Sequence, residues 1–540
     1  PGESYGSVLY PQFSGGGAFT SATSLGSRRY GGSGGGVIRL SAGELVLDGD
    51  LRANGSAGSG GHQAGAGGTV LIEAARLAGG GSIEAQGFEE LHSGGGGGRV
   101  AIWADQLDGF APQSQVSVRG GTSGNDQFPS SRGRGGSGTL FVRTASSIHG
   151  DLFLDAEELD GRPVGATPLP TVGEFLIGSV TPDVGSPTHA WVEPAASGAV
   201  FSVGVRGEWV RVGGVDYRIL EEGSDRRSVL LENASGQISA GAEARGVYKF
   251  DTVTIAQGAF LQVMSVLEAD SVLTPDGGRL ETGETALDSF VVEAGSTVKI
   301  DGLLEVDELR VGGELRPDDG VQGLEIRANR VVVEATGLID VSGHGFSFGT
   351  NDSGLRGLAP EGVVGSLISG SHGGFGASGT GDPGEIFGSV YRPRFSGGGA
   401  GYYNGGIGGG VIEIFAPEIV LEGELRSDGT PGSDGRRGGA GGTILLETDR
   451  LIGAGAIHAR GSDAERSAGG GGRVAILAQE LIGFDPGNQV SAAGGLQTYS
   501  SDMHRGGAGT IYVKTGASTF GDLVVDGQES GGLGMGETLL

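Results

Sequence analysis

Short runs in which apolar and polar residues alternate recur along the chain. In the first copy of the pattern they begin at Val37, Val70, Val100 and Leu140. Alternation at period two is typical of strands that bury one face. Glycines between the runs permit the positive φ that a sharp corner needs. The pattern therefore predicts several short strands in each coil of a repeating β-structure.

The runs share a template of two strands. Residues 70–74 alternate, Leu77 follows, and a second strand at residues 83–86 ends at Gly87. This template predicts an all-β fold, namely a parallel β-helix or β-solenoid with Gly-rich loop excursions and a small inserted β-domain. A β-propeller also has units of about 40 residues. It would need hairpin turns and an aromatic signature in each blade, and neither recurs in the sequence.

A much longer repeat contains these coils. Residues 1–17 return as residues 383–399, and residues 98–102 return as residues 472–476. The two matches indicate a repeated unit of about 375 residues, and stacked repeats must bury one another's faces. We therefore expect the chain to be part of a longer tandem array.

The character of the sequence changes between the two copies. From about residue 186 the Gly-rich rhythm stops, and Trp191 and Trp209 fall among strands joined by tight turns. We expect a small β-domain with both tryptophans in its core; a partner-binding role for this domain is the alternative. The predicted domains are 1–185, β-solenoid with Gly-rich loops; 186–250, inserted β-domain; 251–382, β-solenoid with mostly short loops; and 383–540, a truncated second copy with Gly-rich loops.

Glycine dominates the loops. The chain has 116 Gly among 540 residues, and they cluster in runs such as residues 94–98 and 469–472. Ordering a Gly costs about 0.5–1 kcal/mol more conformational entropy than ordering an Ala. Such loops are either mobile or packed against one another. In the packed alternative they run side by side as polyproline-II-like segments, which have no internal hydrogen bonds and must obtain them from their neighbours.

Composition narrows the classes of partner. The formal net charge is −29 and no Lys/Arg block occurs, so we expect no nucleic acid partner. Cys is absent, which excludes disulfides and thiolate metal sites. No stretch approaches the roughly 18 apolar residues of a membrane span, so we expect no span in this window.

Metal chemistry has weak support in the sequence. The acidic turns at residues 48–50 and 318–320 could bind Ca²⁺ loosely, but neither fits an EF-hand loop. The nonapeptide calcium signature of some β-helices does not recur in the loops. We predict no metal site and no cofactor, with loosely bound Ca²⁺ left open.

Histidines are the first candidates for site chemistry. His344 and His372 sit in similar Gly-rich settings, and we expect both to be solvated loop residues; a shared face is the alternative. None of the eight histidines forms a metal-spaced pair: His62, His92, His149, His189, His344, His372, His458 and His504.

Parallel β-helices include polysaccharide lyases and hydrolases, which place two or three carboxylates on one face. The candidate carboxylates Asp301, Glu305, Asp307 and Glu308 are spread over both faces by strand alternation. Repetition of a unit also favours length or avidity over catalysis. We predict that the protein is not an enzyme, with no catalytic, cofactor-binding or metal-binding residue.

The coil template and the Gly-rich loops resemble those of filamentous-haemagglutinin-type adhesins and other giant, secreted, tandem-repeat β-solenoid proteins of bacterial surfaces. The resemblance covers most of the chain outside residues 186–250. It implies a right-handed parallel β-helix, secretion, and a role in attachment or in building an extracellular fibre. The long Gly-rich excursions and the unusual length of the repeated unit depart from that family.

Two functions from different classes follow. The first is a structural protein of an extracellular fibre or cell-surface appendage, a long rod whose partners are its own copies or neighbouring repeats. The alternative is a surface adhesin that binds glycans or other cells through the Gly-rich loops or the inserted β-domain. A β-helix lyase or hydrolase is the third interpretation.

Overall fold

A computed structural model describes most of the chain. The described residues are 5–18, 21–22, 28–58, 63–90, 93–123, 133–156, 164–275, 278–282, 285–300, 302–318, 320–350, 354–377, 382, 384–498, 504–525, 534–535 and 538. They are almost entirely β, with large and mostly parallel sheets, so the all-β class is confirmed. The helices among them are the four-residue turns α1 (Pro112–Gln115) and α2 (Pro486–Gln489).

The chain forms two compact units, Pro1–Asp288 and Ser289–Leu540. We call them unit 1 and unit 2. The boundary between them falls within β21 (Thr285–Val292).

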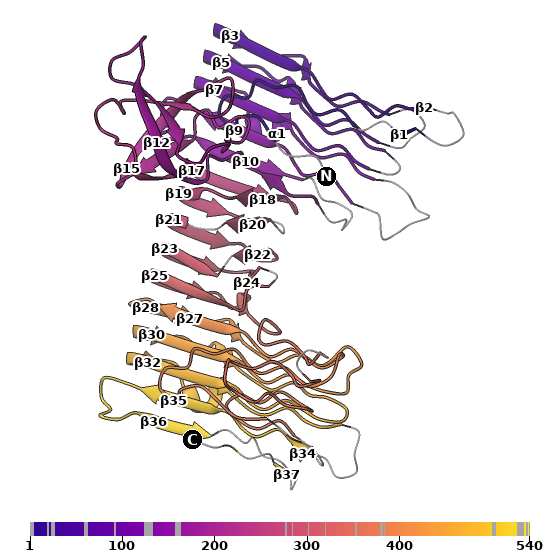
Figure 1. The fold of residues 1–540 in the computed structure, drawn as a ribbon, viewed down its shortest axis with the longest axis vertical. Coiled ribbons are helices and arrows are strands. Elements are labelled where there is room, and N and C mark those ends of the chain that lie inside the picture. Colours follow the sequence, from indigo (N-terminus) through magenta and orange to yellow (C-terminus); the bar gives the residue numbers. More distant parts are fainter. Residues whose placement is uncertain are drawn as a thin grey trace. The chain divides into compact units, whose positions relative to one another are not determined.

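Long parallel strands form the main ladder of unit 1, and successive members lie side by side in Figure 1. They are β3 (Val37–Val46), β5 (Thr69–Ala78), β7 (Arg99–Asp108) and β9 (Thr139–Arg143). Next, β10 (Asp151–Asp155) folds back antiparallel on β9 and pairs in parallel with β17 (Glu243–Ala256). In turn, β17 pairs in parallel with β19 (Val266–Leu273).

Short strands form separate sheets in unit 1. One parallel sheet comprises β4 (Asp50–Arg52), β6 (Ser82–Glu84) and β8 (Val116–Ser117). Another comprises β11 (Thr167–Pro168), β18 (Phe260–Val263) and β20 (Arg279–Thr282). A two-stranded antiparallel sheet joins β1 (Ser21–Ala22) and β2 (Arg28–Arg29).

A compact β-domain is inserted in unit 1. Its strands are β12 (Glu174–Pro182), β13 (Ala190–Pro194), β14 (Trp209–Val212), β15 (Val215–Glu222), β16 (Val229–Leu231) and the first half of β17. Antiparallel pairings run from β12 through β13, β16, β15 and β14 to β17 and back to β12, which closes a ring of six strands. Buried residues such as Val192, Val210 and Ile219 fill it.

The boundaries of this ring differ from residues 186–250. Strand β12 lies before residue 186, and β17 continues past residue 250 without a break. The first half of β17 closes the ring, while its second half pairs with β10 and β19. A single strand therefore belongs both to the domain and to the main ladder.

Unit 2 has two parallel ladders. The long strands are β23 (Leu303–Val311), β25 (Gly323–Val333), β27 (Val411–Phe415), β28 (Glu418–Leu421), β30 (Thr443–Ile452), β32 (Arg473–Ile482) and β35 (Thr510–Lys514). The short strands are β22 (Thr297–Ile300), β24 (Glu314–Pro317), β26 (Leu338–Asp340), β29 (Glu424–Arg426), β31 (Ala456–His458) and β33 (Val490–Ser491). Strand β36 (Asp522–Val525) folds back on β35, and β34 (His504–Arg505) pairs with β37 (Gly534–Met535).

The register of the short strands stacks like residues on like. One column of register partners in unit 2 is aliphatic and buried throughout: Val298, Leu315, Ile339, Leu425, Ile457 and Val490. Flanking residues of these strands point the other way because side chains alternate along a strand. The buried column is the hydrophobic centre, and the flanking residues form a polar outer face.

The Gly-rich segments are bonded to one another. Gly438 and Gly441 donate their N–H groups to Ser467 and Gly470, so donors three residues apart meet acceptors three residues apart. Gly439 and Gly442 likewise donate to one neighbouring segment, at Thr430 and Ser427. A segment that returns to the same neighbour every third residue turns like polyproline II. These are the hydrogen bonds between segments that the packed alternative required.

Many glycines of these bundles leave no room for a Cβ. A Cβ on Gly471 would lie 1.9 Å from the Ala492 carbonyl oxygen, and one on Gly97 would lie 1.8 Å from the Val118 oxygen. In unit 1, Gly65 and Gly68 donate to Ser56 and Ala53, which repeats the interval of three. The bundle therefore requires glycine because its backbones touch.

Candidate functional site

A set of buried polar anchors recurs in both copies of the repeat. The Arg99 guanidinium donates to the Tyr5 carbonyl (3.2 Å) and to Thr139 (3.2 Å). Arg473, the equivalent residue of the second copy, donates to the Phe387 carbonyl (2.9 Å) and to Thr510 (3.0 Å). Burial lowers the pKa of each arginine to about 10.

Further anchors follow the same spacing. The Thr69 and Thr443 hydroxyls each donate to a loop carbonyl at 2.7 Å, that of Phe13 and of Phe395. The side-chain amides of Gln115 and Gln489 each donate at 2.7 Å to a glycine carbonyl one coil away. These polar side chains hold loops onto the strand ladder, and the same contacts are made in both copies.

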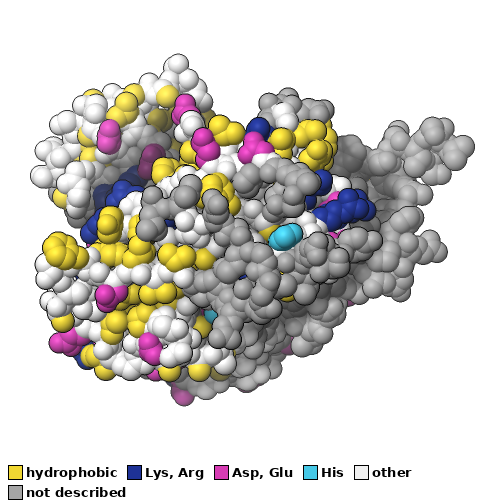
Figure 2. All heavy atoms as spheres, turned by 90° about the horizontal axis from the view of Figure 1, so that it is seen from below, with side chains coloured by type: hydrophobic (Ala, Val, Ile, Leu, Met, Phe, Trp, Pro, Cys, Tyr) yellow, Lys and Arg dark blue, Asp and Glu magenta, His cyan; other side chains and the backbone are white. Residues whose placement is uncertain are grey.

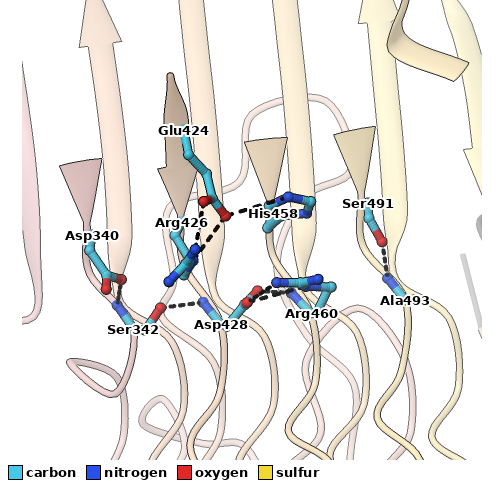
Figure 3. A network of polar contacts seen from close by, with 9 residues as sticks. All are labelled: Asp340, Ser342, Glu424, Arg426, Asp428, His458, Arg460, Ser491 and Ala493. Atoms are coloured by element: carbon cyan, nitrogen blue, oxygen red, sulfur yellow. Dashed lines mark hydrogen bonds and ion pairs between the residues drawn. The ribbon is translucent and has the colours of Figure 1, made fainter. Parts of the chain in front are cut away.

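A ladder of acidic, basic and His side chains lies on and just after the short strands of unit 2 (Figure 3). Arg426 binds Glu424 through two hydrogen bonds (2.9 and 2.5 Å), and Glu424 lies 3.4 Å from His458 on the next strand. Arg460 binds Asp428 through its guanidinium (2.8 Å) and its backbone N–H (2.6 Å). Register pairing places Arg426, His458 and Ser491 in one row.

The electrostatics of the ladder favour neutral His458. Burial is the largest cause that lowers its pKa, and the Arg460 charge acts in the same direction, while Glu424 opposes both. Glu424 in turn raises the pKa of Arg426 through the hydrogen bonds between them. The charged side chains of the ladder therefore pair with one another, Arg426 with Glu424 and Arg460 with Asp428. Because Nε2 of His458 faces Glu424 and Nδ1 is buried, the imidazole belongs to the internal contacts of the ladder.

Unit 1 has polar residues at the corresponding positions. Asn54 donates to Glu84 (2.8 Å) and accepts from the Gln86 N–H (2.8 Å), and Gln86 donates to Ser117 (2.9 Å). Glu84, Gln86 and Ser117 line a groove of about 440 Å³ that also includes Phe153. The position of the ladder is kept between the copies while its residue types change.

A carboxyl with a strongly raised pKa lies at the base of the β-domain. Glu208 is fully buried, and burial raises its pKa to about 8 although Ser265 (2.5 Å) and the Val172 N–H (3.1 Å) donate to it. An inaccessible carboxyl that links β14 to the segments around residues 172 and 265 is a structural group.

A charged cluster in unit 1 was missed by sequence reasoning. Arg211 binds Asp216 (2.7 Å) and Glu268 (2.6 Å), and Lys249 binds the same two carboxylates (2.6 and 2.9 Å). The cluster joins the β-domain to β19. The Gly213-Gly214 turn was the available signal, because a two-residue hairpin brings Arg211 opposite Asp216.

The two tryptophans of the β-domain are not core residues, contrary to expectation. Trp191 and Trp209 are half-buried and lie outside the buried cluster. Strand alternation puts their neighbours Val192 and Val210 inside instead. The Trp191 indole donates to Asp183 at 3.2 Å.

The two candidate histidines contact different parts of the backbone in the structure. His372 is fully buried, which corrects the expectation of a solvated loop residue, because the Gly bundle encloses it; its Nδ1 lies 2.9 Å from the Gly441 oxygen. Burial, followed by the Arg473 charge, lowers its pKa to about 3. His344 is half-buried, with Nδ1 3.0 Å from the Val321 oxygen. His62 and His92 lie outside the described residues.

The candidate carboxylates are paired with polar side chains of the next strand. Glu305 and Glu308 face Arg327 (3.5 Å) and Arg330 (2.8 Å), and Asp307 accepts from Asn329 (2.8 Å). Asp301 lies outside the described residues. The three described carboxylates serve inter-strand ladders.

The acidic turns considered for Ca²⁺ also make internal contacts. Asp50 accepts from Arg52 (2.9 Å) and Ser82 (2.8 Å), and Asp319 lies outside the described residues. Within the described part of the chain, no group of three or more His, Asp or Glu side chains could hold a metal ion. In that same part, neither helix has the length and apolar content of a membrane span.

Comparison with protein-family models, with curated proteins and with solved structures gives no match for this chain. The class that the fold and the contacts define is an almost entirely β protein with large, mostly parallel sheets and a repeated set of polar anchors. The resemblance to filamentous-haemagglutinin-type adhesins stays a prediction from the sequence.

Proposed function

We propose that the protein is a structural component of an extracellular fibre or cell-surface appendage, built as a β-solenoid rod from the long tandem repeats seen in its sequence. The observation that carries this proposal is the recurrence of the anchors Arg99 and Arg473, which bind partners at equivalent positions of the two copies. A repeat that keeps its buried contacts is suited to add length.

The parallel ladders support the solenoid part of this proposal. The short strands of unit 2 pair in parallel, and their buried aliphatic side chains form a continuous column. The long strands also pair in parallel. Neighbouring strands lie about 4.8 Å apart, so each further coil would lengthen the rod by about that amount. A right-handed helix and secretion follow from the family resemblance.

Electron microscopy of the native source material, with an antibody against this chain, tests the proposal. We expect label along continuous extracellular fibres at a regular spacing of one repeat length. Label confined to soluble particles or to the cell interior would contradict a fibre role. An antibody absorbed with the purified chain is the control.

Glycan adhesion is the second candidate, favoured by the polar groove in unit 1. Gln86, Ser117 and Phe153 combine hydrogen-bonding groups with an aromatic ring, which suits a sugar. A glycan array probed with the chain tests this candidate. Binding that Gln86→Ala abolishes would support it, while an array without signal would count against it.

A further inference from the structure

The same short motif is covered in unit 1 and bare in unit 2. Gly6-Ser7-Val8 returns as Gly388-Ser389-Val390. Ser7 is 1% exposed and Val8 is fully buried, whereas Ser389 is exposed and the nearby Tyr391 is 64% exposed. Identical residues with different burial indicate that a covering element is present on one copy only.

In unit 1 the cover is the β-domain. The Gly6 N–H donates to the Val203 carbonyl (2.9 Å), and the Ser7 hydroxyl donates to the Arg206 carbonyl (2.6 Å). A Cβ on Gly204 would lie 2.3 Å from the Gly6 carbonyl carbon, so the two backbones touch. The domain is held to this loop mainly by backbone groups and by one hydroxyl.

Aromatic contacts complete the covered surface. The Tyr10 ring stacks on Trp103 at 4.7 Å, the Arg206 guanidinium lies 4.5 Å from the Tyr10 centroid, and Arg218 donates to the Tyr10 hydroxyl (2.7 Å). Stacking and cation–π contacts of this kind stabilise a docked domain.

Unit 2 has a groove of about 790 Å³ at the corresponding place. Arg392 stands where unit 1 has Tyr10, and Leu477 stands where unit 1 has Trp103; both line the groove together with Phe415, Glu447 and Lys514. Val390, Phe415 and Leu477 pack against a buried cluster that consists of Leu445, Ala475 and Tyr512. The groove has an apolar floor and a charged rim.

Strand β36 extends the bare surface. Its counterpart in unit 1, β10, pairs in parallel with β17 and buries Leu152 completely. In β36 the corresponding Leu523 is 42% exposed and Val525 is 47% exposed. Figure 2 shows the molecule from below, which is the end where Figure 1 labels β36, and hydrophobic side chains are gathered on that face.

We propose that the groove and β36 together are the docking surface for a β-domain of the kind formed by residues 174–256, belonging to a further repeat. The proposal rests on the tandem array of the proposed function. The six-stranded ring would seat its loop on the Gly388 N–H and the Ser389 hydroxyl, and the strand equivalent to β17 would pair with β36. The Gly388 N–H and the Ser389 hydroxyl are the equivalents of the two groups through which Gly6 and Ser7 bind the β-domain of unit 1.

The residue differences define which domain fits. Arg206 and Arg218 suit the Tyr10 ring, whereas Arg392 would repel two arginines at the same positions. The surface therefore selects a domain with neutral or acidic side chains there. The β-domain of unit 1 is matched to its own loop, and a second domain must differ at these two positions.

An extended chain tests the inference. The join is set by Thr538, which donates to the Ala508 carbonyl (2.6 Å) as Thr167, its equivalent in the first copy, donates to Ser137. A second copy of residues 170–288 is added after Leu540, and this added copy alone carries Arg206→Gln and Arg218→Gln. Hydrogen exchange is compared with that of the unextended chain. We expect the amides of residues 388–392 and 522–525 to exchange at least roughly tenfold more slowly.

Two variants of the extended chain are the matched controls. Ser389→Trp places a ring where the two backbones must touch and should abolish the protection, whereas Ser433→Trp, at an exposed serine that does not line the groove, should leave it intact. Protection that survives Ser389→Trp would overturn the proposed seat. The inference would be overturned if the amides of the appended β-domain were protected, which shows that it folds, while those of residues 388–392 exchanged as fast as in the unextended chain.

The outcome is separable from that of the proposed function. Electron microscopy of the native material reports on fibres whether or not residues 388–392 become protected. Fibres without protection in the extended chain would remove this inference alone. Soluble particles in place of fibres would remove the function while the exchange result still reported on docking.

Discussion

The strand ladders and the Gly-rich bundles solve the same packing problem in opposite ways. In the ladders, side chains such as Ile83 and Ile457 fill the space between the sheets and are fully buried. In the bundles, the backbones themselves fill the space, and a Cβ on Gly97 or Gly471 would meet a carbonyl oxygen. Close packing is thus reached once through large side chains and once mainly through contacts between backbones.

The difference teaches where each region is vulnerable. A ladder loses stability when a side chain is removed, because a cavity remains. A bundle loses stability when a side chain is added, because backbone must move. Alanine is therefore harmful in both regions for opposite reasons, and substitutions distinguish the two kinds of packing.

Gly97→Ala should have the largest effect. The new Cβ would lie 1.8 Å from the Val118 oxygen and 2.3 Å from the Gly138 nitrogen, and no rotamer change relieves contacts to backbone. We expect the free energy of unfolding of unit 1, measured by hydrogen exchange, to fall by about 3 kcal/mol or more. Gly80→Ala is the control because its Cβ meets nothing within 4 Å. Equal effects of both changes would contradict backbone packing.

Ile83→Ala should follow closely. Ile83 is fully buried in the core of unit 1, and truncation of such a residue costs about 2–5 kcal/mol. Val46→Ala on β3, where the side chain is mostly exposed, should cost far less. Urea titration followed by circular dichroism compares them. A loss for Ile83→Ala no larger than that for Val46→Ala would show that the ladder core is loosely packed.

His372→Gln isolates a titratable side chain inside a bundle. The folded-state pKa of His372 is about 3, below its unfolded value near 6.5, so the unfolded chain binds more protons between these values. Stability of unit 2 should fall as the pH drops below 6.5, by on the order of 2 kcal/mol at pH 5. His372→Gln should flatten this dependence. Unchanged pH dependence of exchange in unit 2 would argue against a buried neutral imidazole.

Arg76→Gln should have the smallest effect. Arg76 pairs with Glu44 and Asp108 on the exposed face of the ladder, and its pKa is raised mainly by the hydrogen bond to Asp108. Such exposed pairs contribute little to stability because water and salt screen them. When both chains are measured at high salt, we expect the melting temperature of Arg76→Gln to be nearly equal to that of the unsubstituted chain. A shift as large as that of Ile83→Ala would mean that ladder charges, as well as side-chain packing, stabilise the stack.

Period-two alternation was sufficient to predict the all-β class, because buried and exposed residues alternate wherever one sheet face is covered. It could not place the limits of the β-domain. Strand β17 continues past residue 250 as one strand, although its two halves have different partners. Pairing partners distant in sequence leave no mark on a single strand.

The burial of His372 was missed for a related reason. A Gly-rich neighbourhood is typical of exposed turns, and only the stacking of several such segments encloses a side chain. The repeated anchors had a partial signal, since Arg99 and Arg473 belong to the matching blocks. Their partners Tyr5 and Phe387 lie in other blocks, so the contacts themselves could not be predicted.

The interval of three residues in the bundles has a consequence for how these repeats can change in length. An insertion of one residue would rotate every later N–H group by a third of a turn, toward the wrong neighbour. An insertion of three would restore each donor to its own acceptor. The connection between β8 and β9 covers positions 118–138, and its counterpart between β33 and β35 covers positions 492–509, which makes the counterpart three residues shorter. Length changes inside a bundled segment should accordingly come in steps of three residues, a constraint that the loop at residues 18–36, which is eight residues longer than its counterpart at 400–410, does not obey as a whole.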